Sequence, residues 1–134
     1  MHLIINPSDI YYLTGVRPHD PGEILIISDI DAIRVVFCDL RTSALFDKKQ
    51  YHVCDVRGKW DKVFATYTNL NTDPDFLTQT LREKIEGYGV SLFFTKSPIS
   101  ARRVIKNNQE IHQLKKSQQL NKTVYEKILP FLQI

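Results

Sequence analysis

Residues 3–15 have the sequence LIINPSDIYYLTG, which predicts a buried strand that leads directly into a short helix. The first three residues form a continuous apolar run, as in strands that are covered on both faces of a sheet. Asn6 can cap the helix, Pro7 suits its first position, and Asp9 places negative charge near the free amides of the first turn. Residues 10–14 then fill little more than one further turn before Gly15 ends the helix. Such a strand-to-helix step is typical of α/β folds.

Two apolar runs rich in β-branched residues follow this helix, at Glu23–Ser28 and Ala32–Asp39. The link between them, residues 29–31, is short enough for a hairpin, so we expect the two strands to pair antiparallel. Further apolar runs predict strands at Tyr51–Val56, Val63–Tyr67 and Val90–Phe94. Helical spacing and capping signals predict helices at Arg41–Lys49 (with Leu45 and Phe46 turned inward), at Asp75–Glu86 and, after a polar connection that follows Pro98, at 108–129. Strands interleaved with helices predict a three-layer α/β/α domain on a mixed sheet.

The composition is that of a folded, non-membrane domain. The chain has 134 residues, of which 43% are hydrophobic and 25% are charged, with a net charge of +3. A chain of this size can bury about two-thirds of its surface, enough for one core without disulfides or metals. The apolar content and the low net charge exclude a disordered chain, and no window approaches the roughly 20 apolar residues of a membrane span.

The cysteines and the first residues indicate the compartment. Cys38 and Cys54 lie in expected strands and form no CxxC pair, so we expect buried free thiols, which fit a reducing environment. The first residues lack the charged and apolar regions of a secretion signal. Together these features favour the cytoplasm.

Basic residues gather toward the end of the chain. Residues 101–127 hold seven Lys and Arg side chains against two Glu, whereas residues 1–100 have a net charge of −2. A basic segment is one way to bind nucleic acid. Here the charges fall between apolar positions at helical spacing, which favours the solvated face of a helix. We therefore expect no nucleic-acid partner, and duplex binding stays the less favoured alternative.

No segment of the sequence contains a complete set of catalytic or metal-binding residues. A phosphate-binding loop and a GxSxG elbow are absent, and the four histidines are isolated from one another and from other ligand types. His19 differs from the other histidines because it lies, with Arg17, in a stiff loop at residues 16–22 that holds two prolines and a glycine. The sequence predicts no catalytic residue and no metal ligand in this chain. Arg17 and His19 are its candidates for contact with a substrate or partner.

Three segments in a fixed order carry a resemblance to a known family. Residues 6–15 are NPSDIYYLTG, residues 37–41 (FCDLR) are an apolar strand end with Asp-x-Arg, and residues 103–111 are RVIKNNQEI. Together they resemble the N-terminal domain of the creatinase/prolidase family of M24-type metallopeptidases, which includes Xaa-Pro dipeptidases and Xaa-Pro aminopeptidases. Two departures are the start of the chain almost on the first strand, and Ser117, where alanine is common in the family.

The resemblance implies a fold and an enzyme. Residues 1–106 would form an α/β domain with a mostly parallel sheet of about five strands and a ribonuclease H-like motif. Residues 107–134 would form a linker helix that leads toward a catalytic pita-bread domain, which this chain does not contain. That domain binds two divalent ions (manganese, cobalt or zinc) through two Asp, one His and two Glu, and metal-activated water cleaves the bond before proline. We therefore expect no cofactor in this chain and no hydrolase activity from it alone.

For the N-terminal domain the resemblance implies homodimer assembly and a role in covering the active-site entrance to peptide substrates. Arg17 could then bind a peptide carboxylate through two hydrogen bonds, with His19 beside it on the stiff loop. Asp39 and Arg41 are further gating or interface candidates, although a strand-end ion pair or helix cap is the simpler interpretation. The helix at 108–129 has an apolar stripe that would face the catalytic domain, so we expect exposed Leu and Ile and self-association. The alternative function is a stand-alone protein-binding module without a hydrolase domain.

Overall fold

The computed structural model describes residues 1–20, 22–29 and 32–132. The chain divides into two compact units, Met1–Arg103 and Val104–Ile134. The first unit contains a sheet with its helices, and the second is dominated by one long helix. No helix in the described part of the chain is long and apolar enough to cross a membrane.

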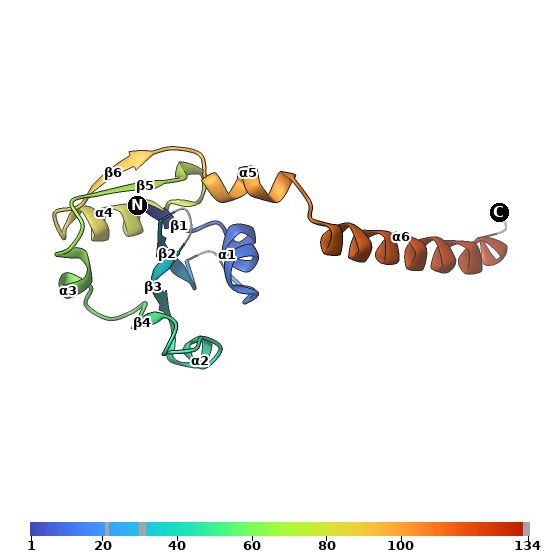
Figure 1. Ribbon diagram of the computed structural model, residues 1–134, viewed down its shortest axis with the longest axis horizontal. Coiled ribbons are helices and arrows are strands. Elements are labelled where there is room, and N and C mark those ends of the chain that lie inside the picture. The colour runs from blue at the N-terminus through green and yellow to red at the C-terminus, as the bar shows by residue number, and fades with distance from the viewer. Residues whose placement is uncertain (21, 30–31, 133–134) are drawn as a thin grey trace. The chain divides into compact units, whose positions relative to one another are not determined.

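The first unit is built on a six-stranded sheet. Its strands are β1 (His2–Ile4), β2 (Leu25–Ser28), β3 (Ile33–Cys38), β4 (His52–Asp55), β5 (Asn69–Thr72) and β6 (Ser91–Phe94). They lie in the order β4-β3-β2-β1-β5-β6 (Figure 1). β2 is antiparallel to β1 and β3, and the other neighbours pair in parallel. The mixed, mostly parallel sheet is confirmed, with six strands where about five were expected, and so is the pairing of β2 with β3. Residues 30 and 31 of the expected hairpin link lie outside the described residues.

Helices cover both faces of this sheet. They are α1 (Pro7–Thr14), α2 (Leu40–Ser43), α3 (Asp61–Phe64), α4 (Gln79–Glu86) and α5 (Pro98–Val104). On one face, Phe37 of β3 packs against Trp60 and Phe64, with ring centroids 4.8 and 5.7 Å away. On the other face, Cys38 of β3 packs in the same cluster as Ile10 of α1. Figure 1 shows α3 and α4 on one side of the central strands and α1 on the other, so the three-layer architecture is confirmed.

The chain between β4 and β6 differs from the expectation. The strand expected at Val63–Tyr67 is wrong, because this segment contains the end of α3 and the turn after it. Phe64 of α3 is buried, stacked on Phe37 and in edge contact with the partly buried Tyr67. The strand lies later, at β5, where Leu70 is the buried hydrophobic residue. With one large apolar residue, β5 lacks the alternation of apolar and polar residues that marks a strand in a sequence. Its place in the chain is therefore determined by pairing with β1 and β6.

Two of the expected helices have different bounds. A helix was expected at Arg41–Lys49, but α2 includes only Leu40–Ser43. Phe46 is buried, as expected. The expected inward position of Leu45 is wrong, because its exposed fraction is 66%. The helix expected at Asp75–Glu86 begins as a 3₁₀ turn and continues as α4 only after a new cap at Thr78.

The chain around β6 also departs from the expectation. The strand at residues 90–94 is confirmed, but Phe93 and Phe94 are 54% and 48% exposed because β6 lies at the edge of the sheet. A polar connection was expected after Pro98, but this segment is the helix α5. Its residue Ile99 is buried in the core and packs the helix against it.

The helix predicted after β1 is confirmed, and its acidic residue has a further role. Asn6 accepts a hydrogen bond from the Ser8 amide at 2.9 Å, and Gly15 ends α1 in the left-handed conformation, with φ of 71°. Asp9 lies in the first turn as expected, but its side chain is completely buried. Its Oδ1 accepts from Arg103 Nη1 at 2.7 Å and its Oδ2 from Ser100 Oγ at 3.1 Å. Because a buried carboxylate requires such partners, this cluster holds α5 against α1.

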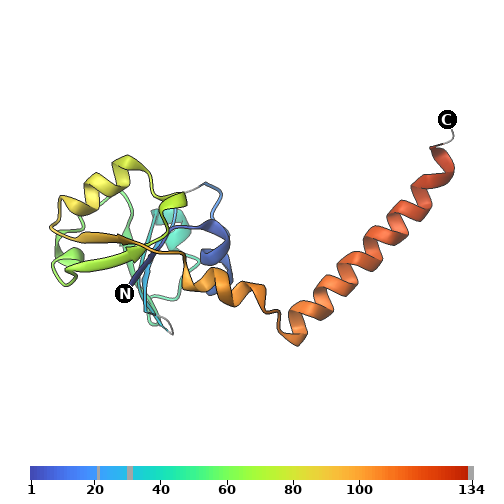
Figure 2. The ribbon, with the colours of Figure 1, turned by 90° about the horizontal axis from the view of Figure 1, so that it is seen from above.

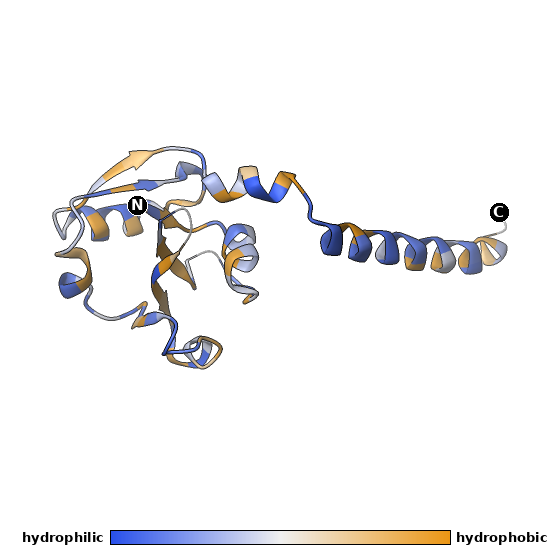
Figure 3. Ribbon diagram, viewed as in Figure 1, coloured by the Kyte–Doolittle hydropathy of each residue, from blue (hydrophilic) through white to orange (hydrophobic). Residues whose placement is uncertain are grey.

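The second unit consists mainly of α6 (Asn108–Ile128), followed by a 3₁₀ turn at Leu129–Phe131. The capping box is present, with Asn107 and Glu110 each accepting the other's amide proton, at 2.9 and 2.8 Å. No side chain of α6 is buried, and apolar residues recur along the helix between polar ones (Figure 3). The exposed apolar residues of this helix are Ile111, Leu114, Leu120, Val124, Tyr125 and Ile128. The expected exposure of Leu and Ile is therefore observed in this unit.

Loss of one partner of the buried Asp9–Arg103 pair is expected to destabilise the first unit. Arg103→Met leaves the carboxylate buried with Ser100 as its side-chain donor, and should lower the free energy of unfolding by about 3 kcal/mol. Asp9→Asn is neutral and of equal size, so it should cost less, about 1–2 kcal/mol. Urea unfolding followed by circular dichroism measures both changes.

The matched control for this prediction is Arg41→Met. Arg41 pairs with Asp39 at 3.3 Å, but its side chain is 91% exposed, so the loss of this surface pair should leave stability nearly unchanged. Equal effects of Arg103→Met and Arg41→Met would contradict the special role of the buried pair.

Candidate functional site

The four candidate residues lie on two segments at the same end of the sheet. Arg17 and His19 lie in the loop between α1 and β2, and Asp39 and Arg41 lie where β3 passes into α2. The antiparallel register that pairs Leu25 with Phe37 brings the two segments together, because it continues toward the start of β2 and the end of β3. The loop and the start of α2 are therefore neighbours, as the expected hairpin requires.

Glu23 connects the two segments. Its Oε2 accepts hydrogen bonds from the amides of His19 at 2.7 Å and Asp20 at 3.3 Å, and its Oε1 accepts from the Thr42 hydroxyl at 3.3 Å. These donors stabilise the charged form, so the pKa of the Glu23 carboxyl is lowered, chiefly by the His19 amide and against a smaller opposing effect of burial. The carboxylate thus ties the loop to the first turn of α2.

Asp39 is the N-cap of α2. Its Oδ1 accepts from the Thr42 amide at 2.7 Å, and its Oδ2 accepts from Arg41 Nε at 3.3 Å. The Thr42 amide is the main reason why the pKa of Asp39 is lowered. The strand-end ion pair and the cap that the sequence favoured are both observed, while the guanidinium of Arg41 remains turned to solvent.

The loop is fixed at several points and presents its basic side chains. Pro18 is buried, whereas Arg17 and His19 on either side of it are exposed. Gly22 has φ of 85°, which permits the turn just before Glu23. Pro21, part of the expected loop, lies outside the described residues. With the His19 and Asp20 amides held by Glu23, residues 17–20 can bind a carboxylate-bearing partner with little further loss of conformational entropy.

Three titratable groups at this end of the sheet, Glu23, Cys38 and Asp39, have pKa values shifted away from neutral pH. Burial, followed by the charges of Asp39 and Asp55, raises the pKa of the Cys38 thiol to about 11. This thiol therefore stays protonated. The carboxylates of Glu23 and Asp39 have lowered pKa values and accept hydrogen bonds from amides. Within residues 1–20, 22–29 and 32–132, no cluster of three or more His, Cys, Asp and Glu side chains could hold a metal ion.

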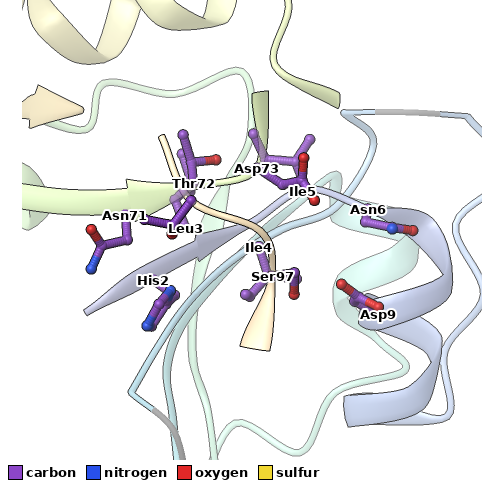
Figure 4. Close-up of a pocket in the computed structure, with 11 residues that line it drawn as sticks. His2, Leu3, Ile4, Ile5, Asn6, Asp9, Asn71, Thr72, Asp73 and Ser97 are labelled. Atoms are coloured by element: carbon purple, nitrogen blue, oxygen red, sulfur yellow. The ribbon is translucent and has the colours of Figure 1, made fainter. Parts of the chain in front are cut away.

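A small cavity lies at the carboxyl ends of β1 and β5, beside the first turn of α1 (Figure 4). Its volume of about 10 Å³ is room for about one water molecule and excludes a substrate. Its polar lining includes Asn6, Asp9, Asp73 and Ser97. Thr72 also lines it, and the buried Thr72 Oγ1 has no hydrogen-bond partner in the described part of the chain. Because such a hydroxyl is costly to bury alone, the cavity fits a single bridging water.

Glu23 is the site residue that the sequence reasoning missed. It stands at the start of an apolar run, where the pattern places it in the strand. The signal that could have found it is the hairpin register, which places residue 23 opposite residue 39 once Leu25 is aligned with Phe37. At this position the Glu23 carboxylate lies between the free amides of the preceding loop and the first turn of α2. It therefore has hydrogen-bond donors on both sides.

Comparison with known proteins gives matches in structure. No protein-family model matches the chain, and no curated protein matches it in sequence. An Xaa-Pro dipeptidase from Bacillus anthracis superposes with a TM-score of 0.77 at 20% identity, over 98% of this chain and 38% of that one. A prolidase from Pyrococcus horikoshii OT3 has a TM-score of 0.73 at 14% identity, again over 98% and 38%. The creatinase/prolidase N-terminal domain of an X-Pro dipeptidase from Streptococcus pyogenes has a TM-score of 0.50 at 18% identity, over 69% and 79%.

These matches confirm the fold that the sequence motifs implied. The first unit has the six-stranded mixed sheet and helices of the creatinase/prolidase N-terminal domain. The chain spans 38% of the length of the two full-length enzymes.

The Glu23 carboxylate is expected to make stability depend on pH. The pKa of Glu23 is lower in the folded protein than in the unfolded chain, where it is about 4.3. Its contribution to the free energy of unfolding is therefore complete above the pKa of the unfolded chain, and it is lost as pH falls through the pKa of the folded protein. Glu23→Gln removes this contribution. The stability difference between the wild type and Glu23→Gln should be constant from neutral pH to about 5 and shrink below it. Urea unfolding at a series of pH values measures the difference, and an unchanged difference at acidic pH would contradict the role of the charge.

Thr72→Val tests the water in the cavity. Valine keeps the shape of threonine but cannot hydrogen-bond, so a bound water would lose a partner and the free energy of unfolding should fall by about 1 kcal/mol. Thr68→Val, at an exposed position just before β5, should have little effect. A gain in stability from Thr72→Val would mean that the hydroxyl is buried without a water and would refute the prediction.

Proposed function

We propose that this chain is the N-terminal, non-catalytic domain of a cytoplasmic, metal-dependent Xaa-Pro dipeptidase or Xaa-Pro aminopeptidase. The observation that carries the proposal is the superposition on the Bacillus anthracis dipeptidase, which includes nearly all of this chain but a minor part of that enzyme. The motifs at residues 6–15, 37–41 and 103–111 support the assignment independently.

Hydrolysis would take place in a second domain. The two divalent ions (manganese, cobalt or zinc) that the resemblance implies do not fit the described residues, which contain no suitable group of ligands. The catalytic domain would therefore hold them. The contribution of this chain is then confined to binding and positioning, in keeping with carboxylates that serve as hydrogen-bond acceptors for amides.

The N-terminal domain would contribute to dimer assembly and to gating of the active site. The exposed apolar residues of α6, among them Leu114 and Leu120, support contact with a catalytic domain, because such a stripe is normally covered. The segment that carries Arg17 and His19 supports gating, since the hydrogen bond from the His19 amide to Glu23 holds it before a partner binds. In this role Arg17 would bind the carboxylate of the peptide substrate through both of its terminal nitrogens.

A stand-alone protein-binding module is the second candidate. The exposed face of α6 also favours this function, because a partner protein would cover it as well as a catalytic domain would. The two functions differ in whether the gene encodes a catalytic domain after Ile134.

The proposal is tested with the protein continued beyond Ile134 in its own reading frame. This longer protein should hydrolyse an Xaa-Pro dipeptide in the presence of manganese, whereas residues 1–134 alone should not. Arg17→Ala in the longer protein should raise KM about tenfold with little change in kcat, because it removes a hydrogen-bonded charge pair with the substrate.

Arg57→Ala is the matched control, since Arg57 is an exposed arginine in the turn after β4. It should leave KM unchanged. A stop codon directly after Ile134, or hydrolysis by residues 1–134 alone, would contradict the proposal, and an unchanged KM in Arg17→Ala would contradict the gating role.

A further inference from the structure

The open edge of the sheet at β6 has the features of a surface that pairs with another strand. β6 lies at one end of the sheet, with β5 as its neighbour on one side only (Figures 1 and 2). We propose that β6 pairs antiparallel with β6 of a second copy of this chain, around a two-fold axis at Phe93. This inference deepens the dimer-assembly part of the proposed function and rests on it.

The backbone of β6 determines which groups are available. The amides of Ser91 and Thr95 donate to Thr68 and Thr72 on the β5 side, at 2.9 and 3.0 Å. The backbone N–H and C=O groups of successive residues point alternately to the two sides of a strand. Those of Phe93 therefore point toward β5, and those of Leu92 and Phe94 point to the open edge. Unpaired edge groups of this kind are a template for another strand.

These open groups are self-complementary. When Phe93 faces its own copy, Leu92 lies opposite Phe94 of the other strand, and the two residues can exchange both of their backbone hydrogen bonds. The same exchange occurs on the other side of the axis, so every outward-facing residue of β6 has a partner. Phe93 then forms a non-hydrogen-bonded pair with its copy, in which side chains approach closely.

The side chains of β6 also favour this partner. Phe93 and Phe94 are each about half exposed on adjacent positions of the edge, and pairing would cover them. The opposite edge of the sheet, β4, instead begins with His52 and ends with Asp55, both exposed. Charged and polar residues protect an edge strand from pairing, and β6 has no charged residue within its span.

Charges on α4 complement one another across the same axis. The Arg82 guanidinium lies over the Phe94 ring, 5.3 Å from its centre, and pairs with Glu86 one turn later at 2.9 Å. α4 runs back along β6, so Glu86 lies nearer the start of the strand. The two-fold axis therefore places Arg82 of each copy near Glu86 of the other. The two Arg82–Glu86 ion pairs would then form a network of four charged side chains.

The expected association is weak. Two paired four-residue strands bury less than the roughly 1,200–2,000 Å² of a stable interface. The dimer should therefore form only as the protein concentration rises, unless further contacts in a longer protein add to it.

Cysteine cross-linking of the full chain tests the axis directly. Paired non-hydrogen-bonded residues lie within the Cα distance of a disulfide, so Phe93→Cys should cross-link to its copy under mild oxidation. Ser91→Cys is the control, because the same register places Ser91 opposite Thr95 and not opposite itself. We expect about tenfold more cross-linked dimer from Phe93→Cys than from Ser91→Cys. The native Cys38 and Cys54 are present in both variants.

Sedimentation velocity at rising concentration separates β6 from the exposed helix α6. Phe93→Lys should weaken association about tenfold or more. Leu120→Lys can remove only the self-association expected of the apolar residues of α6, so it should leave the cross-linking of Phe93→Cys unchanged. Circular dichroism tests whether both variants are folded. The inference is overturned if the chain stays monomeric, if the two cysteine variants cross-link equally, or if only Leu120→Lys weakens association. These outcomes leave the hydrolysis test of the longer protein unaffected, so failure of the inference and failure of the proposed function are distinguishable.

Discussion

The ion pair between Asp9 and Arg103 is the interaction on which the arrangement of the first unit depends. The two residues are 94 positions apart, and the hydrogen bond between them is 2.7 Å long. Asp9 is excluded from water, so its charge is compatible with folding only when α5 supplies the Arg103 guanidinium and the Ser100 hydroxyl. The pair therefore links the first helix of the unit to the last one. It also joins residues 6–15 to residues 103–111, the first and third of the sequence segments described above.

The same corner of the fold contains most of the buried polar groups of the first unit. Asp9 and Thr72 both line the small cavity at the carboxyl ends of β1 and β5. In an α/β sheet this is the place where ligands usually bind, between strand ends and helix starts. Here the space is reduced to about one water, because Asp9 is turned inward to Arg103 and not toward a ligand. At this corner the Asp9 carboxylate holds α1 and α5 together.

The sequence predicted the parts of the fold whose signals are local. The strand-to-helix step at residues 3–15, the antiparallel pairing of β2 with β3, and the capping box at Asn107 are each specified within a few residues, and all are present. β5 and α5 were missed because their positions depend on partners far away in the chain. Leu70 is buried through strand neighbours on both sides, and Arg103 becomes structural only when α1 is beside it. In the candidate site, Asp39 could be predicted as a cap from its position at a strand end, whereas the role of Glu23 required the register between two strands.

The carboxylates of the first unit indicate what kind of contribution this chain can make to a reaction. A general acid or base needs a pKa near the working pH and a free path to the substrate. Glu23 and Asp39 have the opposite properties, since amide donors lower their pKa values and occupy their oxygens. Cys38, with a pKa of about 11, is equally unsuited to act as a nucleophile. The exposed basic side chains at this end of the sheet include Arg17 and Arg41, of which Arg41 also pairs with Asp39, and a guanidinium can bind a carboxylate. Glu23, Asp39 and Cys38 thus serve the local structure as hydrogen-bond acceptors or as a buried thiol.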